Sequence, residues 1–131
     1  MKMKLREAIS RHNDLAALTT QTYPTRLSYV ISKNLKKLED ETKNYEEERK
    51  KVCERLAEKD EKGAPIIEDD KYVMTDANKK TLSKEVDDLL NMEVEVEIQI
   101  VDVSVLDQCD TSERYHVPTA QEIMALDFML E

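Results

Sequence analysis

The sequence predicts an α+β fold that is mainly helical, with a long antiparallel helical hairpin, a small antiparallel β-sheet and two further helices. The chain of 131 residues contains one Gly and three Pro, only 5% of its residues are aromatic and 40% are hydrophobic. So few turn-forming residues argue against an all-β fold, and an aliphatic core of this size suits one domain. We therefore expect a single domain over residues 1–131, with a hairpin arm at 1–62 and a small α+β part at 63–131.

The first helix is predicted over residues 3–20. Its less polar positions recur three and four residues apart, which places them on one helix face. They are Leu5, Ala8, Ile9, His12, Leu15, Ala16 and Thr19. Pro24 disfavours a helical conformation at Tyr23 and suits the first turn of a new helix. The first helix therefore ends before Tyr23, and a second helix begins near Pro24.

The second helix is predicted over residues 24–60, a stretch without an internal Gly or Pro. One face of this helix is marked by positions that follow one another at alternating steps of four and three residues, as in a coiled coil. We call this row of positions the seam. The seam positions are Ile31, Leu35, Leu38, Thr42, Tyr45, Arg49, Val52 and Leu56. Such a helix is about 54 Å long, whereas the first is only about 25 Å long. We expect the far half of the seam to be covered by the C-terminal helix, a second copy of the chain or a target protein.

Strand and helix patterns alternate in the second half of the chain. Residues 66–67 and 72–74 flank an acidic turn, which predicts a small hairpin. Thr75 or Asp76 caps a third helix that runs to residue 90. The side chains expected on its buried face are Leu82, Val86, Leu89 and Leu90.

The strongest strand pattern covers residues 93–105. Apolar and polar residues alternate from 93 to 100, and the alternation resumes one residue out of phase at Val101, which predicts a β-bulge. Thr119 and Glu122 then form a capping-box pattern that opens a final helix through Leu130. Because this helix is apolar on most sides, we expect it to be docked in the fold or in an assembly.

The charges are distributed unevenly along the chain. The net charge is −9, yet residues 1–37 contain eight basic and two acidic side chains, a net of +6 (8 − 2). We expect the basic part and the acidic remainder to attract each other within the fold. Alternatively, they form two surfaces of opposite charge to which a partner binds. The overall acidity argues against broad affinity for nucleic acid.

No residue pattern predicts a catalytic, cofactor or metal site. His12, His116, Cys53 and Cys109 lack the close spacings of structural zinc sites, and two distant cysteines do not make a disulfide framework. The chain also lacks an apolar run long enough for a membrane helix, and its first residues turn polar too soon for a signal peptide. We expect a reduced, cytoplasmic protein that is not an enzyme.

Two surfaces are candidates for binding a partner. The first is the far half of the second helix, where the side chains are spaced as anchors for a groove. The second is an acidic strand face that repels DNA or imitates it. The candidate residues are Tyr45, Arg49, Val52 and Leu56 on the helix and Glu93, Glu95 and Glu97 on the strand. The alternatives are packing within the chain or a homodimer for the helix, and a solvated surface for the strand.

Several segments of the chain resemble a family of small, largely uncharacterised proteins of phages and prophages of Gram-positive bacteria. They are KLREAI at 4–9, LSYVISKNL at 27–35, YEEERKK at 45–51, the EVEVEI strand and ALDFM at 125–129. The resemblance implies a phage protein that acts in the bacterial cytoplasm, and it transfers no catalytic residue.

Three functions follow as hypotheses. The leading one is an anti-defence inhibitor or modulator that binds a host protein, as anti-CRISPR proteins do. The second is a virion component or assembly factor. The third is a nucleic-acid binder that uses basic side chains of the predicted hairpin. Those side chains are Lys2, Lys4, Arg6, Arg11, Lys33, Lys36 and Lys37.

Overall fold

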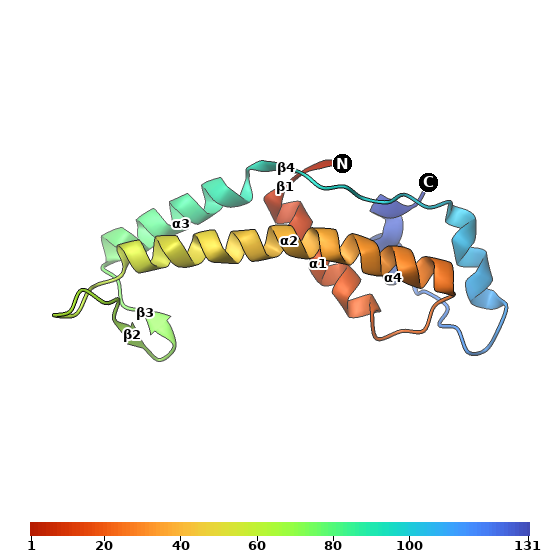
Figure 1. Cartoon of the computed structure of the whole chain (residues 1–131), viewed down its shortest axis with the longest axis horizontal. Coiled ribbons are helices and arrows are strands. Elements are labelled where there is room, and N and C mark those ends of the chain that lie inside the picture. The colour runs from red at the N-terminus through yellow and green to blue at the C-terminus, as the bar shows by residue number, and fades with distance from the viewer.

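The long helix α2 (Thr25–Leu56) is the spine of the molecule (Figure 1). The computed structural model describes all residues from 1 to 131. The helix begins one residue later than predicted, because Pro24 is its N-cap and has an extended ψ of 147°. The 32 residues of α2 contain no break, so the helix is about 48 Å long. It ends four residues before the predicted end at residue 60 because the backbone becomes extended at Ala57 (φ −66°, ψ 149°).

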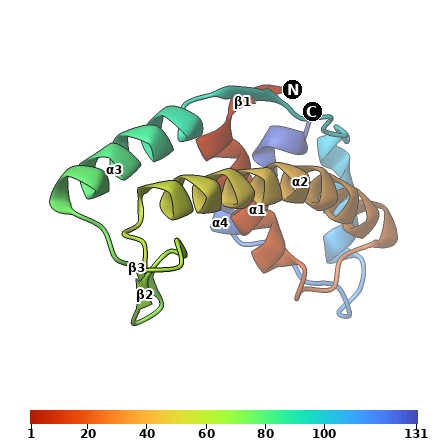
Figure 2. The same cartoon turned by 60° about the vertical axis from the view of Figure 1, so that its left-hand side comes forward.

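Helix α1 (Leu5–Leu18) crosses the N-terminal half of α2 in both views (Figures 1 and 2). The predicted apolar face is where the two helices pack, with Ala8 and Leu15 of α1 and Leu27 and Leu38 of α2 completely buried. This pair confirms the mainly helical fold. Residues 2–4 were not predicted as a strand, but they form β1 (Lys2–Lys4) directly before α1.

Helix α3 (Asp76–Leu90) lies beside the C-terminal half of α2 (Figures 1 and 2). Thr75 caps it as predicted, since its hydroxyl accepts a hydrogen bond from the Asn78 N–H at 3.1 Å. The cover of the far half of α2 is therefore α3, which was not among the three covers expected. We call residues 39–56 of α2 together with α3 the arm.

The expectation that α3 buries its apolar face is wrong. None of its residues is buried, and its four large apolar side chains all remain partly exposed. The reason is that α2 covers only one strip of α3, whereas an amphipathic helix has an apolar stripe at least about 100° wide.

Two small antiparallel sheets complete the secondary structure. Strand β1 pairs with β4 (Glu93–Glu95), so that Lys2 lies opposite Glu95 and Lys4 opposite Glu93. Strands β2 (Ile67–Glu68) and β3 (Lys71–Tyr72) form the predicted acidic hairpin. The turn between β2 and β3 contains Asp69 and Asp70 at positive φ (52° and 63°), a conformation that Asp tolerates better than most residues.

The predicted continuation of the strand after residue 95, with its β-bulge, is wrong. No strand pairs with the chain beyond β4; only Val101 forms an isolated bridge, with Leu130. Val103 to Asp110 then form the 3₁₀ helix η1, whose first turn is capped by Asp102 through a 2.8 Å bond from the Ser104 N–H. The alternating pattern correctly indicates an extended chain, but a strand also needs a neighbour.

The C-terminal segment folds back onto the core. The predicted capping box of Thr119 and Glu122 opens α4 (Ala120–Leu126), and the short 3₁₀ helix η2 (Asp127–Met129) follows. Leu126 and Met129 are completely buried, but Met124 is 76% exposed, so the docking of this helix is only partial. No helix of the chain is both long enough and apolar enough to span a bilayer.

Candidate protein-binding surface

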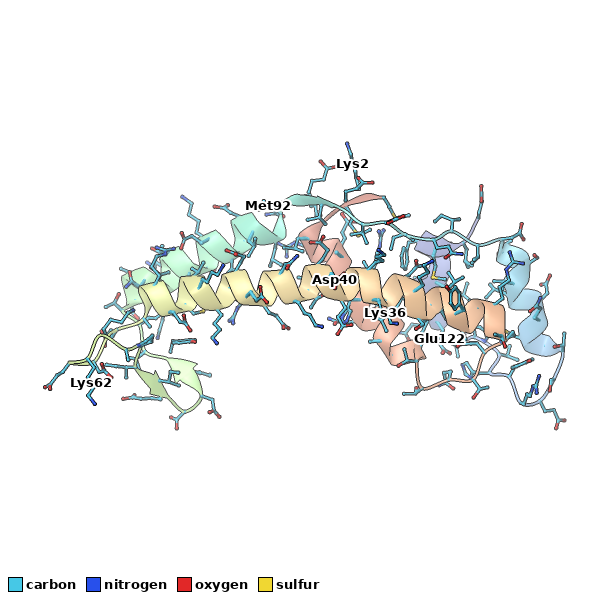
Figure 3. All side chains as sticks on the ribbon, in the orientation of Figure 1. Lys2, Lys36, Asp40, Lys62, Met92 and Glu122 are labelled. Atoms are coloured by element: carbon cyan, nitrogen blue, oxygen red, sulfur yellow. The ribbon has the colours of Figure 1, made fainter.

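A groove runs between α2 and α3 in the arm. The groove has a volume of about 380 Å³. Three apolar and three acidic side chains line it. They are Val52, Leu89 and Met92, with Glu48, Glu85 and Asp88. Met92 is 57% exposed, and Figure 3 shows it at the end of α3 nearest the middle of α2. The groove therefore presents apolar side chains with carboxylates around them.

The other flank of α3 is also incompletely covered. Val86 and Leu90 line a second hollow there, with the side chains of Lys80 and Lys84. Helix α3 thus has partly exposed apolar side chains on both flanks. Two helices side by side bury only the strip between them, and a third element is needed to cover the rest. The chain itself does not supply that element on the groove side.

The ion pairs of the arm leave several charges free. Glu48 pairs with Lys51 at 3.0 Å, and this bond raises the pKa of Lys51. Arg55 pairs with Glu85 across the two helices. Glu46, Glu47 and Arg49 make no ion pair within the chain. The middle of α2 therefore has charges that remain available to a partner.

The predicted helix anchors are only partly accessible. Tyr45 and Val52 are half-buried, and Val52 lies in the groove. Arg49 is exposed although it occupies a seam position, so the seam is uncovered there. Leu56 is buried at 8% exposure, and its carbonyl accepts a hydrogen bond from the Asn78 side chain. Leu56 therefore belongs to the packing of α2 with α3.

The predicted acidic strand face is matched by basic groups of the same chain. Glu95 binds the amino group of Met1 at 2.9 Å, and Glu97 lies 3.7 Å from Lys37. Glu93 lies opposite Lys4 in the register of β1 and β4 but forms no ion pair with it. These contacts agree with the expected attraction between the basic N-terminal part and the acidic remainder. They leave little unbalanced negative charge with which to imitate DNA.

A polar cluster that sequence reasoning missed joins His116, Glu122 and Tyr23. His116 Nε2 lies 2.8 Å from Glu122 Oε1, and the Tyr23 hydroxyl donates to Glu122 Oε2 at 3.3 Å. The bond to His116 and the bond from the Thr119 backbone lower the pKa of Glu122 to about 2. Burial, followed by the nearby Glu122 carboxylate, raises the pKa of Tyr23.

This cluster holds the loop before α4 against the rest of the fold. The backbone N–H of His116 also donates a hydrogen bond to the Thr22 carbonyl at 2.7 Å. The capping box indicated the position of Glu122, but no periodic pattern marks a histidine six residues earlier. Because every oxygen of the Glu122 carboxylate already has a partner, its main effect is to fix the loop.

The other candidate chemical groups lie apart from one another. Cys53 and Cys109 are both buried, and burial raises the pKa of Cys109, which disfavours a reactive thiolate. His12 is half-buried on α1 beside Asn13. No group of three or more His, Cys, Asp or Glu side chains is arranged to hold a metal ion.

Three of the seven basic side chains proposed for nucleic-acid binding form ion pairs within the chain. Arg6 binds Asp87 at 2.9 Å, Arg11 lies 3.7 Å from Glu7, and Lys37 faces Glu97. Lys33 lies above the ring of Tyr29, 5.8 Å from its centroid. The basic hairpin therefore offers fewer free cations than its sequence suggests.

Comparison with known proteins gives no further guide to the site: no family model matches the chain, and neither a curated protein nor a solved structure matches it.

Proposed function

We propose that the chain is a non-enzymatic protein-binding module that docks a partner in the groove of the arm. The proposal rests on an exposed apolar surface at α3. None of the residues of α3 is buried, and Met92, which follows the helix, is exposed. We further propose that the partner is a host protein which the chain inhibits or modulates in the bacterial cytoplasm. The sequence resemblance to phage and prophage proteins supports this second step.

The groove suits a helix of the partner. Val52, Leu89 and Met92 offer an apolar floor, the kind of surface by which helix-in-groove complexes gain affinity. Full burial of one such side chain contributes about 1.5 to 3 kcal/mol. Of the three acidic side chains around that floor, Glu48 and Glu85 already pair with Lys51 and Arg55, and only Asp88 makes no ion pair. Asp88 therefore favours a basic residue beside the apolar stripe of the partner helix.

The test compares two exposed methionines. Met92→Glu places a charge in the groove, whereas Met124→Glu places the same charge on α4, where Met124 is even more exposed. Both substitutions are expected to leave the fold intact. Tagged wild-type chain and the Met124→Glu variant should recover the same dominant protein from a lysate of a Gram-positive host, and the Met92→Glu variant should lose it.

Two outcomes contradict the proposal. Equal recovery by all three chains would place the binding surface elsewhere. Recovery of phage structural proteins alone would favour the alternative of a virion component or assembly factor.

Nucleic-acid binding is a second candidate because one exposed aromatic side chain lies on a basic helix face. Tyr29 is 61% exposed beside Lys33 and Lys36, and such rings stack on unpaired bases. Glu39 and Asp40 line the same hollow and oppose phosphate. If this function held, a single-stranded oligonucleotide would shift in a gel at low salt, and Lys33→Glu with Lys36→Glu would abolish the shift.

A further inference from the structure

Four basic side chains and one tyrosine form a stripe along the N-terminal half of α2. Each member lies three or four residues after an earlier one, which places them all on one face of the helix. They are Arg26, Tyr29, Lys33, Lys36 and Lys37. We call these five residues the basic stripe. All five are exposed, and Figure 3 shows Lys36 in this half of α2.

The cations of the basic stripe are available to an anion. Arg26 and Lys36 make no ion pair within the chain. Lys37 lies 3.7 Å from Glu97, and both side chains are exposed, at 45% and 90%. An exposed pair of this kind contributes little free energy, so an anionic ligand can replace Glu97. Because the net charge of the chain is −9, such a ligand is repelled by most of the surface and attracted to the basic stripe.

Tyr29 lies among these cations with its ring open to solvent. The residue is 61% exposed and lines one hollow together with Lys33 and Lys36. Lys33 Nζ lies 5.8 Å from the centroid of the ring. Proteins that bind single strands combine aromatic rings, on which bases stack, with cations that hold the phosphates. An acidic peptide has phosphate-like charge but no base to stack, so the ring favours nucleic acid as the ligand.

The basic stripe is short and ends against negative charge. From residue 26 to residue 37 the helix rises about 17 Å. Over that length one strand carries about five phosphates, whereas a duplex carries about ten. Four cations therefore balance the charge of a single strand better than that of a duplex. Further along α2 a longer duplex would meet the exposed carboxylates of Asp40 and Glu47.

We infer that a short single-stranded segment of nucleic acid binds along the basic stripe, with one base stacked on Tyr29 and its phosphates held by the four cations. The inference rests on the second candidate function and deepens it, because it fixes the strand state and the footprint of the ligand. It does not depend on the arm groove, which uses the C-terminal half of α2 together with α3.

Fluorescence anisotropy of a labelled oligothymidylate with the full chain tests the role of the cations. Lys33→Gln with Lys36→Gln is the stripe variant. The control is Lys50→Gln with Lys62→Gln, which changes the net charge equally at two exposed lysines outside the basic stripe. The slope of log affinity against log salt should be about −2.8 for wild type and control and about −1.4 for the stripe variant, because each phosphate contact contributes about −0.7. Equal slopes for the two variants would overturn the inference.

Two substitutions of Tyr29 test the stacking. Tyr29→Phe keeps the ring and should bind oligothymidylate as wild type does. Tyr29→Ala should bind it at least about fivefold more weakly, because the stacked base loses its support. The corresponding duplex and polyglutamate should also bind more weakly than oligothymidylate, since neither offers an unpaired base. Equal binding of polyglutamate, or an unchanged affinity of Tyr29→Ala, would contradict the stacking and overturn the inference.

The outcomes separate this inference from the functions proposed above. No binding of oligothymidylate at low salt contradicts both the nucleic-acid function and the inference. Binding that is weakened equally in the stripe variant and in its control leaves the nucleic-acid function in place and overturns the inference. Met92→Glu should bind oligothymidylate as wild type does, so a failure of the arm to capture a host protein leaves this result unaffected.

Discussion

The side-chain amide of Asn34 binds both backbone groups of Gln99. Asn34 Oδ1 accepts from the Gln99 N–H at 2.8 Å, and Asn34 Nδ2 donates to the Gln99 carbonyl at 3.0 Å. Asn34 is the one buried polar residue of the chain. It takes the place of a neighbouring strand for the extended segment that follows β4, and it fastens that segment to α2.

Replacing Asn34 by Leu should therefore destabilise the fold. The change keeps the side-chain size but leaves two backbone groups of Gln99 without a partner, which costs about 1 to 3 kcal/mol. Asn44→Leu, at an exposed position of the same helix, is the control and should change the stability by less than about 0.5 kcal/mol. Denaturant unfolding measures both, and equal effects would contradict this role of Asn34.

The pKa of Glu122 predicts a loss of stability in acid. Hydrogen bonds, first from His116, lower it from its ordinary value of 4.5 to about 2. A depressed carboxyl pKa adds stability above the unfolded value, and that stability is lost as the pH falls from about 4.5 to about 2. The free energy of unfolding should fall more steeply over this range in wild type than in Glu122→Gln. Identical slopes would contradict the prediction.

The N-cap residue Thr75 should stabilise α3 and with it the arm. Thr75→Ala removes the hydroxyl that accepts from the Asn78 N–H and should cost about 1 kcal/mol. Thr81→Ala is the matched control, because its hydroxyl only bonds back to the Ala77 carbonyl within the helix. The two variants are compared by thermal unfolding, and no difference between them would count against the cap.

Both cysteines should be unreactive in the folded protein. Cys53 is 3% exposed and Cys109 is 1% exposed, and burial raises the pKa of Cys109. An aromatic disulfide reagent should label neither thiol in buffer and both in denaturant. Fast labelling of the native chain would show that the packing around η1 or the end of α2 opens readily.

The sequence predicted those parts of the fold that depend on local signals. The three-and-four spacing located α1 and α2, Pro24 marked the start of α2, and the capping patterns at Thr75 and Thr119 located the first turns of α3 and α4. Each of these signals acts within a few residues, so it does not depend on the tertiary structure.

The sequence did not predict features that depend on distant partners. Residues 96–102 have the pattern of a strand, but their neighbours are Asn34 and Leu130, which lie far away in the chain. Strand β1 is only three residues long and is recognisable only from its pairing with β4. No local rule specifies which extended segment finds a partner strand.

The groove combines residues from two helices that are distant in the chain, and of these residues only Val52 was named from the sequence as a candidate for binding a partner. Of the predicted helix anchors, Val52 lines the groove, Arg49 is exposed and Leu56 is buried. The contribution of α3 to the groove was missed, because the apolar residues of α3 were expected to be buried and not to line a groove open to solvent. Leu89 and Met92 thus became visible as site residues only in the structure.

We propose that the arm is an incomplete helical layer which another protein completes. Hydrogen exchange of the backbone amides tests this proposal, by comparing the free chain with the complex that the tagged chain captures. Amides of α3 and of residues 39–56 of α2 should exchange more slowly in the complex, while those of α1 and α4 stay unchanged. Unchanged exchange in α3, with new protection elsewhere on the surface, would contradict the claim.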